Sequence, residues 1–314
     1  MPIRISRLAV LLLAAAAPGG APAADFAGRV DIGGGRMMHV ECRGEGAPAV
    51  VIVAGAKASA ADWTEVPEGA PPGTPDVFAA IGAFTRVCAY DRPGTPFGEG
   101  PSRSDPVAQP RSAAEGAEDL QALIAAAGLA PPVVLVAHSW GGLIARMLAR
   151  TRPGEVAGMV LVDALSVGLR AAETPEEWAI QRVLLSGDMT EVLRLYPEIE
   201  LLDPDPSFDA LLAAPPLAPM PLVVLSADHP WGPIVREMVA DGRMPPGVPP
   251  EFGDITDRAA RAAQAGLAAS VPGARHVTHT DSGHEIHKDQ PQLVIDAVRD
   301  VVDAVRAGAL SMVP

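Results

Sequence analysis

The stretch PVVLVAHSWGG at residues 132–142 decides the fold. Its apolar run through Ala137 predicts a buried strand, and Gly142–Arg150 has the pattern of a helix. Ser139 therefore lies in a turn between a strand and a helix, which is the context that a nucleophile elbow requires. Such a turn holds the serine in a strained backbone conformation above the carboxyl ends of the strands. The positions two before and two after the serine must be small, and Gly141 meets this requirement, whereas Ala137 replaces the usual glycine.

Apolar runs and helical patterns alternate on both sides of this stretch. Further strands are predicted at Ala49–Val53, Arg86–Tyr90, Val156–Val162, Leu222–Leu225 and His276–Thr280. Helices are predicted at Ser112–Ala127 and Pro291–Arg306. Short buried strands that alternate with helices indicate an α/β fold, with a mostly parallel sheet and helices on both faces.

A run of three glycines near the start of the chain indicates a turn. Gly33-Gly34-Gly35 separates the runs Arg29–Ile32 and Met37–Cys42 and predicts a hairpin, which would form an antiparallel edge of the sheet.

The alternation stops between Leu165 and Pro221. Thr174-Pro175-Glu176-Glu177 forms a capping box with proline at the first helical position, and short helices follow without a strand. This pattern predicts a small helical cap at about residues 165–220, inserted between two strands of one domain at 25–314. Residues 242–250 are rich in proline and glycine and predict a surface loop.

The first 24 residues have the pattern of a signal peptide. Arg4 and Arg7 precede the apolar run Leu8–Ala17, and Ala21-Pro22-Ala23 supplies an A-x-A cleavage site. An uncleaved anchor or a frayed tail is the alternative. Cleavage would make the protein secreted or periplasmic.

The net charge and the hydropathy of the chain predict a small-molecule substrate, with neither nucleic acid nor membrane as a partner. The formal charge of −14 excludes a nucleic-acid partner, since phosphate binding needs a basic surface. No apolar run of about 18 residues follows the N-terminus, so no stable membrane insertion is expected after cleavage. No cofactor is expected. The histidines do not match the zinc motif H-E-x-x-H, because His284 and His287 are three residues apart and the motif needs four.

Together these motifs resemble the α/β-hydrolase superfamily, and in particular its serine esterase and lipase-like members with a helical cap. The resemblance covers nearly all of the chain after the first 24 residues. The motifs that carry it are Val51–Gly55, Tyr90–Gly94, the elbow around Ser139, Val160–Asp163 and Ser282-Gly283-His284. One departure follows Gly94, where Thr95-Pro96-Phe97-Gly98 replaces a second glycine and a serine.

The resemblance implies a Ser-His-Asp triad. Ser139 would be the nucleophile, and His284, after the last predicted strand, would be the base. Two aspartates suit the order along the chain: Asp163 after the strand that follows the elbow helix, which we favour, and Asp228 after the next strand. The oxyanion hole would use the backbone N–H groups of Trp140 and Ala56.

Four further residues are candidates for the substrate pocket because of their positions in the sequence. Gly55, Lys57, Trp63 and Trp178 are candidates for the substrate pocket, although core packing is the simpler role for the tryptophans.

The strand order of the superfamily would also bring Cys42 near Cys88. In an oxidising compartment this pair would form a disulfide, the alternative being two separate buried thiols.

These features predict a serine hydrolase that cleaves a small-molecule carboxylic ester through an acyl-enzyme. An amidase, an aminopeptidase or a lactonase could use the same triad. Two alternatives from other functional classes are a lyase and a non-catalytic binding protein with the same fold.

Overall fold

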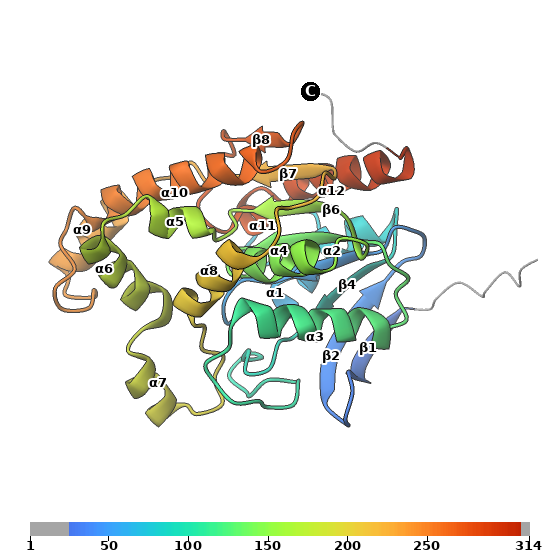
Figure 1. Cartoon of the computed structure of the whole chain (residues 1–314), viewed down its shortest axis with the longest axis horizontal. Helices are drawn as coiled ribbons and strands as arrows, with labels where there is room; N and C mark the ends of the chain where they lie inside the picture. Colours follow the sequence, from blue (N-terminus) through green and yellow to red (C-terminus); the bar gives the residue numbers. More distant parts are fainter. Residues whose placement is uncertain (1–24, 309–314) are drawn as a thin grey trace, which may run out of the picture.

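An eight-stranded sheet forms the centre of the computed structural model, which describes residues 25–308 (Figure 1). The strands are β1 (Phe26–Asp31), β2 (Met37–Arg43), β3 (Val50–Val53), β4 (Val87–Tyr90), β5 (Val133–His138), β6 (Val156–Val162), β7 (Leu222–Leu225) and β8 (Arg275–Val277). Their order across the sheet is β1-β2-β4-β3-β5-β6-β7-β8. β2 pairs antiparallel with β1 and β4, and the remaining neighbours are parallel. The predicted α/β architecture is confirmed, while the predicted signal peptide lies outside the described residues.

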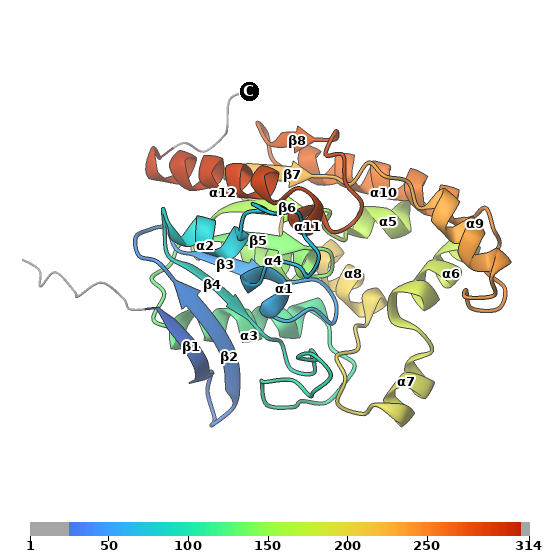
Figure 2. The ribbon, with the colours of Figure 1, turned by 180° about the vertical axis from the view of Figure 1, so that it is seen from behind.

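Helices cover both faces of the sheet (Figure 2). They are α1 (Ala61–Thr64), α2 (Val77–Gly82), α3 (Ala113–Ala126), α4 (Gly141–Thr151), α5 (Val167–Ala171), α6 (Pro175–Ser186), α7 (Met189–Leu195), α8 (Pro204–Ala213), α9 (Gly232–Ala240), α10 (Phe252–Ala269), α11 (Ile286–Asp289) and α12 (Pro291–Arg306). Alternate residues of β5 face opposite sides, so Leu135 packs in the core beneath α3 and α4, and Val136 in the core beneath α2 and α12. This double burial explains the continuous apolar run of the strand. Within residues 25–308, no helix is both long and apolar enough to cross a membrane.

Two helical excursions, each a segment that connects two neighbouring strands of the sheet, lie near one another. The chain between β6 and β7 forms α5 to α8, and the chain between β7 and β8 forms α9 and α10. α10 packs against α5, α6 and α9 (Figure 1). α9 and α10 were not predicted from the sequence. Residues 242–250 form the loop between these two helices, as predicted.

The last strand is shorter than predicted. β8 ends at Val277, whereas the sequence predicts a strand to Thr280. Residues 278–280 form no strand, and the Thr280 hydroxyl donates to the carbonyl oxygen of Ser226, directly after β7, at 2.9 Å.

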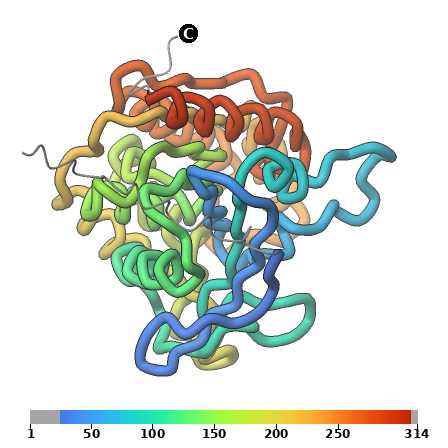
Figure 3. Tube along the Cα trace, turned by 90° about the vertical axis from the view of Figure 1, so that its right-hand side faces the viewer, coloured from blue at the N-terminus to red at the C-terminus, as the bar shows by residue number. Residues whose placement is uncertain are grey.

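The hairpin of β1 and β2, blue in the tube of Figure 3, forms one edge of the sheet. β2 and β4 hold the two cysteines in register. Cys42 on β2 lies opposite Cys88 on β4, and their sulfur atoms are 2.06 Å apart in a disulfide. The bond closes a loop between residues 46 positions apart. In the chain-entropy model a loop of this length stabilises the fold by about 4 kcal/mol, because it restricts the unfolded chain.

Candidate active site

Ser139 occupies the sharp turn between β5 and α4. Its φ is +51°, a left-handed conformation that non-glycine residues rarely adopt. The turn is fixed to β6 because the Ser139 N–H donates to the carbonyl oxygen of Val162 at 3.2 Å. A Cβ atom on Gly141 would overlap the carbonyl oxygen of Val53. The close approach of this turn to β3 therefore explains why the residue two positions after the serine is glycine.

His284 lies beside Asp163, although 121 positions separate them in the chain. The Nδ1 atom of His284 is 2.6 Å from Oδ2 of Asp163, which directly follows β6. The other carboxylate oxygen of Asp163 accepts from the Ala227 N–H at 3.1 Å and from Nε2 of Gln264 at 3.4 Å. Asp163 is thereby fixed in an orientation that presents one oxygen to the imidazole.

Asp228 has a different set of partners. Its Oδ1 accepts from the Ser282 N–H at 3.0 Å and from the Thr280 hydroxyl at 3.2 Å. The hydrogen bond from Ser282 holds the pKa of Asp228 below its ordinary value. Asp228 therefore ties the loop after β7 to the loop that carries His284, and Asp163 is the aspartate hydrogen-bonded to His284.

Three histidines in this region have different pKa shifts. Burial lowers the pKa of His284, but the hydrogen bond and charge of Asp163 together with the charge of Glu285 outweigh it, so the pKa lies above its ordinary value. Burial, together with the nearby His284, lowers the pKa of His138 to about 3. His138 therefore stays neutral, and its Nε2, 3.0 Å from the carbonyl oxygen of His284, must carry the proton that it donates. Burial also brings the pKa of His287 well below its ordinary value.

A cavity of about 360 Å³ opens beside Ser139, Asp163 and His284. It extends beneath the two excursions, where α5, α6, α9 and α10 supply most of its lining. The lining is predominantly apolar and includes Leu165, Leu169, Leu184, Val235, Met238 and Met244. The structure thus places a serine hydroxyl and a hydrogen-bonded histidine–aspartate pair at an apolar pocket.

None of the four residues proposed for the pocket, Gly55, Lys57, Trp63 and Trp178, lines this cavity, which corrects that prediction. Trp63 is 2% exposed and stacks on the ring of His287, with 4.1 Å between centroids. Trp178 packs against Phe208 and donates from Nε1 to Asp205 at 2.8 Å. The buried Trp63 serves core packing, and the half-buried Trp178 packs against the edge of the core.

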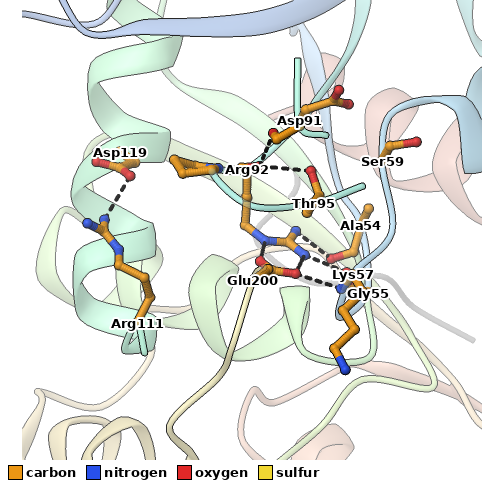
Figure 4. A network of polar contacts seen from close by, with 12 residues as sticks. Ala54, Gly55, Lys57, Ser59, Asp91, Arg92, Thr95, Arg111, Asp119 and Glu200 are labelled. Atoms are coloured by element: carbon orange, nitrogen blue, oxygen red, sulfur yellow. Dashed lines mark hydrogen bonds and ion pairs between the residues drawn. The ribbon is translucent and has the colours of Figure 1, made fainter. Parts of the chain in front are cut away.

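The loop after β3 runs next to the nucleophile. A Cβ atom on Gly55 would lie 3.3 Å from the Cβ of Ser139, so this loop touches the elbow. Lys57 has a φ of +57°, and its backbone N–H donates to Glu200 at 2.6 Å. Gly55 and Lys57 thus belong to the loop predicted to supply an oxyanion donor. Figure 4 shows this loop with Arg92 and Glu200, which the sequence analysis did not assign to the site.

One group of side chains within residues 25–308 has the composition of a metal site. Ligand atoms of His138, His284 and Glu285 lie within 4.8 Å of one another. Nε2 of His138 is engaged by the carbonyl oxygen of His284, and Nδ1 of His284 by Asp163. Each imidazole therefore has a single ring nitrogen left for a proton or a ligand.

The profile of the alpha/beta hydrolase family matches residues 50–297, so the chain belongs to that family. The uncharacterized protein YqjL of Bacillus subtilis (strain 168) is 26% identical over 279 residues, which are 85% of this chain and 88% of YqjL. The uncharacterized protein C23C11.06c of Schizosaccharomyces pombe (strain 972) is 38% identical over 92 residues, 29% of this chain and only 16% of that protein. Among solved structures, a thermophilic esterase from Thermogutta terrifontis has a TM-score of 0.52 at 20% identity, covering 90% of this chain and 99% of that one. The structural likeness shows the α/β-hydrolase fold.

Proposed function

We propose that this protein is a serine hydrolase that cleaves a small-molecule carboxylic ester through an acyl-enzyme. One observation carries the proposal: the hydrogen bond of 2.6 Å between His284 and Asp163 lies at the cavity that Ser139 also lines. A serine hydroxyl is a weak nucleophile until a neighbouring base takes its proton. A histidine whose second nitrogen is held by a carboxylate is suited to this task.

The proposed mechanism assigns one step to each group. The Ser139 oxygen attacks the ester carbonyl carbon while Nε2 of His284 takes its proton, and the carbonyl electrons move onto oxygen. The backbone N–H groups of Trp140 and Ala56 stabilise this oxyanion. Collapse of the intermediate breaks the bond to the alcohol, which leaves with the proton from His284. Water then repeats the sequence on the acyl-enzyme and releases the carboxylic acid.

Asp163 acts through His284 in this mechanism. Its carboxylate fixes the imidazole tautomer with the proton on Nδ1, so that Nε2 faces the serine as an acceptor. It also stabilises the imidazolium that forms during attack, in accord with the raised pKa of His284.

The lining of the cavity supports an apolar substrate. Leucine, valine and methionine side chains dominate the walls, so an aliphatic or aromatic acyl or alcohol group is buried favourably there. The cavity volume of about 360 Å³ favours a group larger than acetyl.

A labelling experiment combined with a substrate panel tests the proposal. A fluorophosphonate probe is expected to add to Ser139, as located by peptide mass spectrometry. Hydrolysis of p-nitrophenyl esters is expected to be faster for medium acyl chains than for acetate. Matched amides and lactones in the same panel separate the ester hydrolase from the amidase and lactonase alternatives. An unlabelled Ser139 together with no hydrolysis of any panel member would contradict the proposal.

The pH dependence of kcat/KM follows from the state of His284. The base must be neutral to accept the serine proton, so activity rises as pH increases through its pKa. Because Asp163 and Glu285 raise this pKa above 6.5, the midpoint of the rise is expected above pH 6.5. Initial rates from pH 5 to 9 check this. A midpoint at or below 6.5 would be inconsistent with a His284–Asp163 base.

The proposed location of this enzyme is outside the cytoplasm. The disulfide between Cys42 and Cys88 suits an oxidising compartment. Cell fractionation with and without residues 1–24 tests the proposed signal peptide.

A further inference from the structure

Arg92 and Glu200 form a buried ion pair beside the loop that follows β3 (Figure 4). The side chain of Arg92 lies just beyond β4, and Glu200 comes from the excursion between α7 and α8. Arg92 is 5% exposed and Glu200 is 2% exposed. Nε of Arg92 is 2.5 Å from one carboxylate oxygen, and Nη2 is 3.0 Å from the other. Burying two charges carries a large desolvation cost, and good geometry alone seldom makes such a pair more stabilising than apolar side chains.

Arg92 and Glu200 also form hydrogen bonds to backbone groups of the loop that follows β3. Nη1 of Arg92 donates to the carbonyl oxygen of Ala54 at 2.8 Å, and Nη2 donates to that of Gly55 at 2.5 Å. Glu200 accepts from the backbone N–H of Lys57 at 2.6 Å. The pair therefore binds backbone groups on both sides of Ala56.

These contacts dictate the direction of the Ala56 N–H. In a planar trans peptide, the C=O of one residue and the N–H of the next point in opposite directions. Because the Gly55 carbonyl is drawn toward Arg92, the Ala56 N–H is directed away from Arg92. The same loop touches the nucleophile, since a Cβ on Gly55 would lie 3.3 Å from the Cβ of Ser139.

We propose that Arg92 and Glu200 are positioning residues that orient the Ala56 N–H as an oxyanion donor and link it to the helical excursion over the cavity. This inference rests on the proposed function, because it concerns the oxyanion hole of that reaction. Gly94 serves the same arrangement. It has a φ of +84°, its carbonyl oxygen accepts from the Glu200 N–H at 2.9 Å, and a Cβ there would lie 2.5 Å from the Glu200 nitrogen. The motif Tyr90-Asp91-Arg92-Pro93-Gly94 thus supplies both the cation and the close approach of the acid.

Arg92→Met is expected to lower kcat for the best panel ester by roughly 100-fold, the usual effect of losing an oxyanion donor. Arg92→Lys retains the charge but not the fork of donors, so an intermediate loss is expected. An alkyl boronic acid forms a tetrahedral adduct on the serine that needs the oxyanion donors, whereas an alcohol of the same chain length only fills the cavity. The Ki of the boronic acid is expected to rise by a similar factor, and the Ki of the alcohol to stay within about twofold.

A double variant separates positioning from stability. Arg92→Met with Glu200→Met removes both buried charges, so its Tm is expected to lie nearer the wild-type value than that of Arg92→Met alone. Its kcat is expected to remain low, because the loop is still released. Asp119→Asn is the matched control: Asp119 is a 5% exposed carboxylate paired with Arg111 that does not contact the loop, and its kcat is expected to stay within about threefold of wild type.

The outcomes distinguish this inference from the proposed function. If wild type is labelled by the fluorophosphonate and hydrolyses esters, but Arg92→Met keeps its kcat, the positioning role is wrong and the hydrolase stands. A kcat that recovers with Tm in the double variant also overturns the positioning role. If wild type is neither labelled nor active, the proposed function fails first and the inference fails with it.

Discussion

Ser139→Ala is expected to lower kcat for a p-nitrophenyl ester by roughly 10⁴- to 10⁶-fold. The reason is that the acyl-enzyme route needs the serine oxygen, and what remains is the oxyanion hole and substrate binding acting on direct attack by water. The measurement is the initial rate at saturating ester, with highly purified protein, since traces of a host esterase would hide a loss of this size. The Tm and circular dichroism of the variant report whether the elbow still folds.

Ser270→Ala is a matched control for this substitution. The Ser270 hydroxyl donates to the Leu267 carbonyl oxygen at the end of α10, on the exposed surface and away from the cavity. Its kcat is expected to equal that of wild type. A Ser139→Ala variant that retains wild-type activity, or a probe adduct on another residue, would refute Ser139 as the nucleophile.

Asp163→Asn is expected to lower kcat by roughly 10⁴-fold, because an amide at this position holds the imidazole in the wrong tautomer. The substitution also removes the charge that raises the pKa of His284, so the residual activity is expected to rise with pH at a lower midpoint than in wild type. Rates measured across pH separate the two effects. The loss of kcat appears as a lower rate on the high-pH plateau of the pH–rate profile. The change in pKa appears as a shift in the pH at which the rate rises.

Asp228→Asn provides the contrasting variant. Asp228 accepts hydrogen bonds from Ser282 and Thr280, so its loss loosens the loop that carries His284 without changing the imidazole tautomer. Its kcat is expected to fall by about tenfold or less, with a lower Tm. The reverse ranking of the two variants would assign the acid to Asp228.

The strands and the elbow could be predicted because their signals are local. The run at β5 is apolar from Val133 to Ala137, and β6 and β7 have the bounds that the sequence predicts. α10 was missed for the opposite reason. Its buried positions include Gly253, Asp257 and Gln264, so few large apolar side chains mark its buried face.

The contacts of the site join residues that lie far apart in the chain, and no local sequence pattern indicates which residues will meet. Asp163 and Asp228 both follow strands that end at the same edge of the sheet, and only the hydrogen bonds differ between them. Glu200 lies 108 positions from Arg92, and the motif around Arg92 contains no signal for its partner. The pocket tryptophans were misplaced because a large apolar ring fits a pocket wall and a core equally well in a sequence pattern.

The position of Asp163 after β6 has a consequence for how substrate selectivity can be altered. With His284 hydrogen-bonded to a carboxylate from β6, the chain after β7 need not supply that partner, and it carries α9 and α10 over the cavity instead. Replacing residues 232–250, which comprise α9 and the loop at residues 242–250, would therefore reshape the wall at Met238 and Met244 while leaving the histidine–aspartate pair in place. This division makes residues 232–250 a natural place for library-based engineering of chain-length preference.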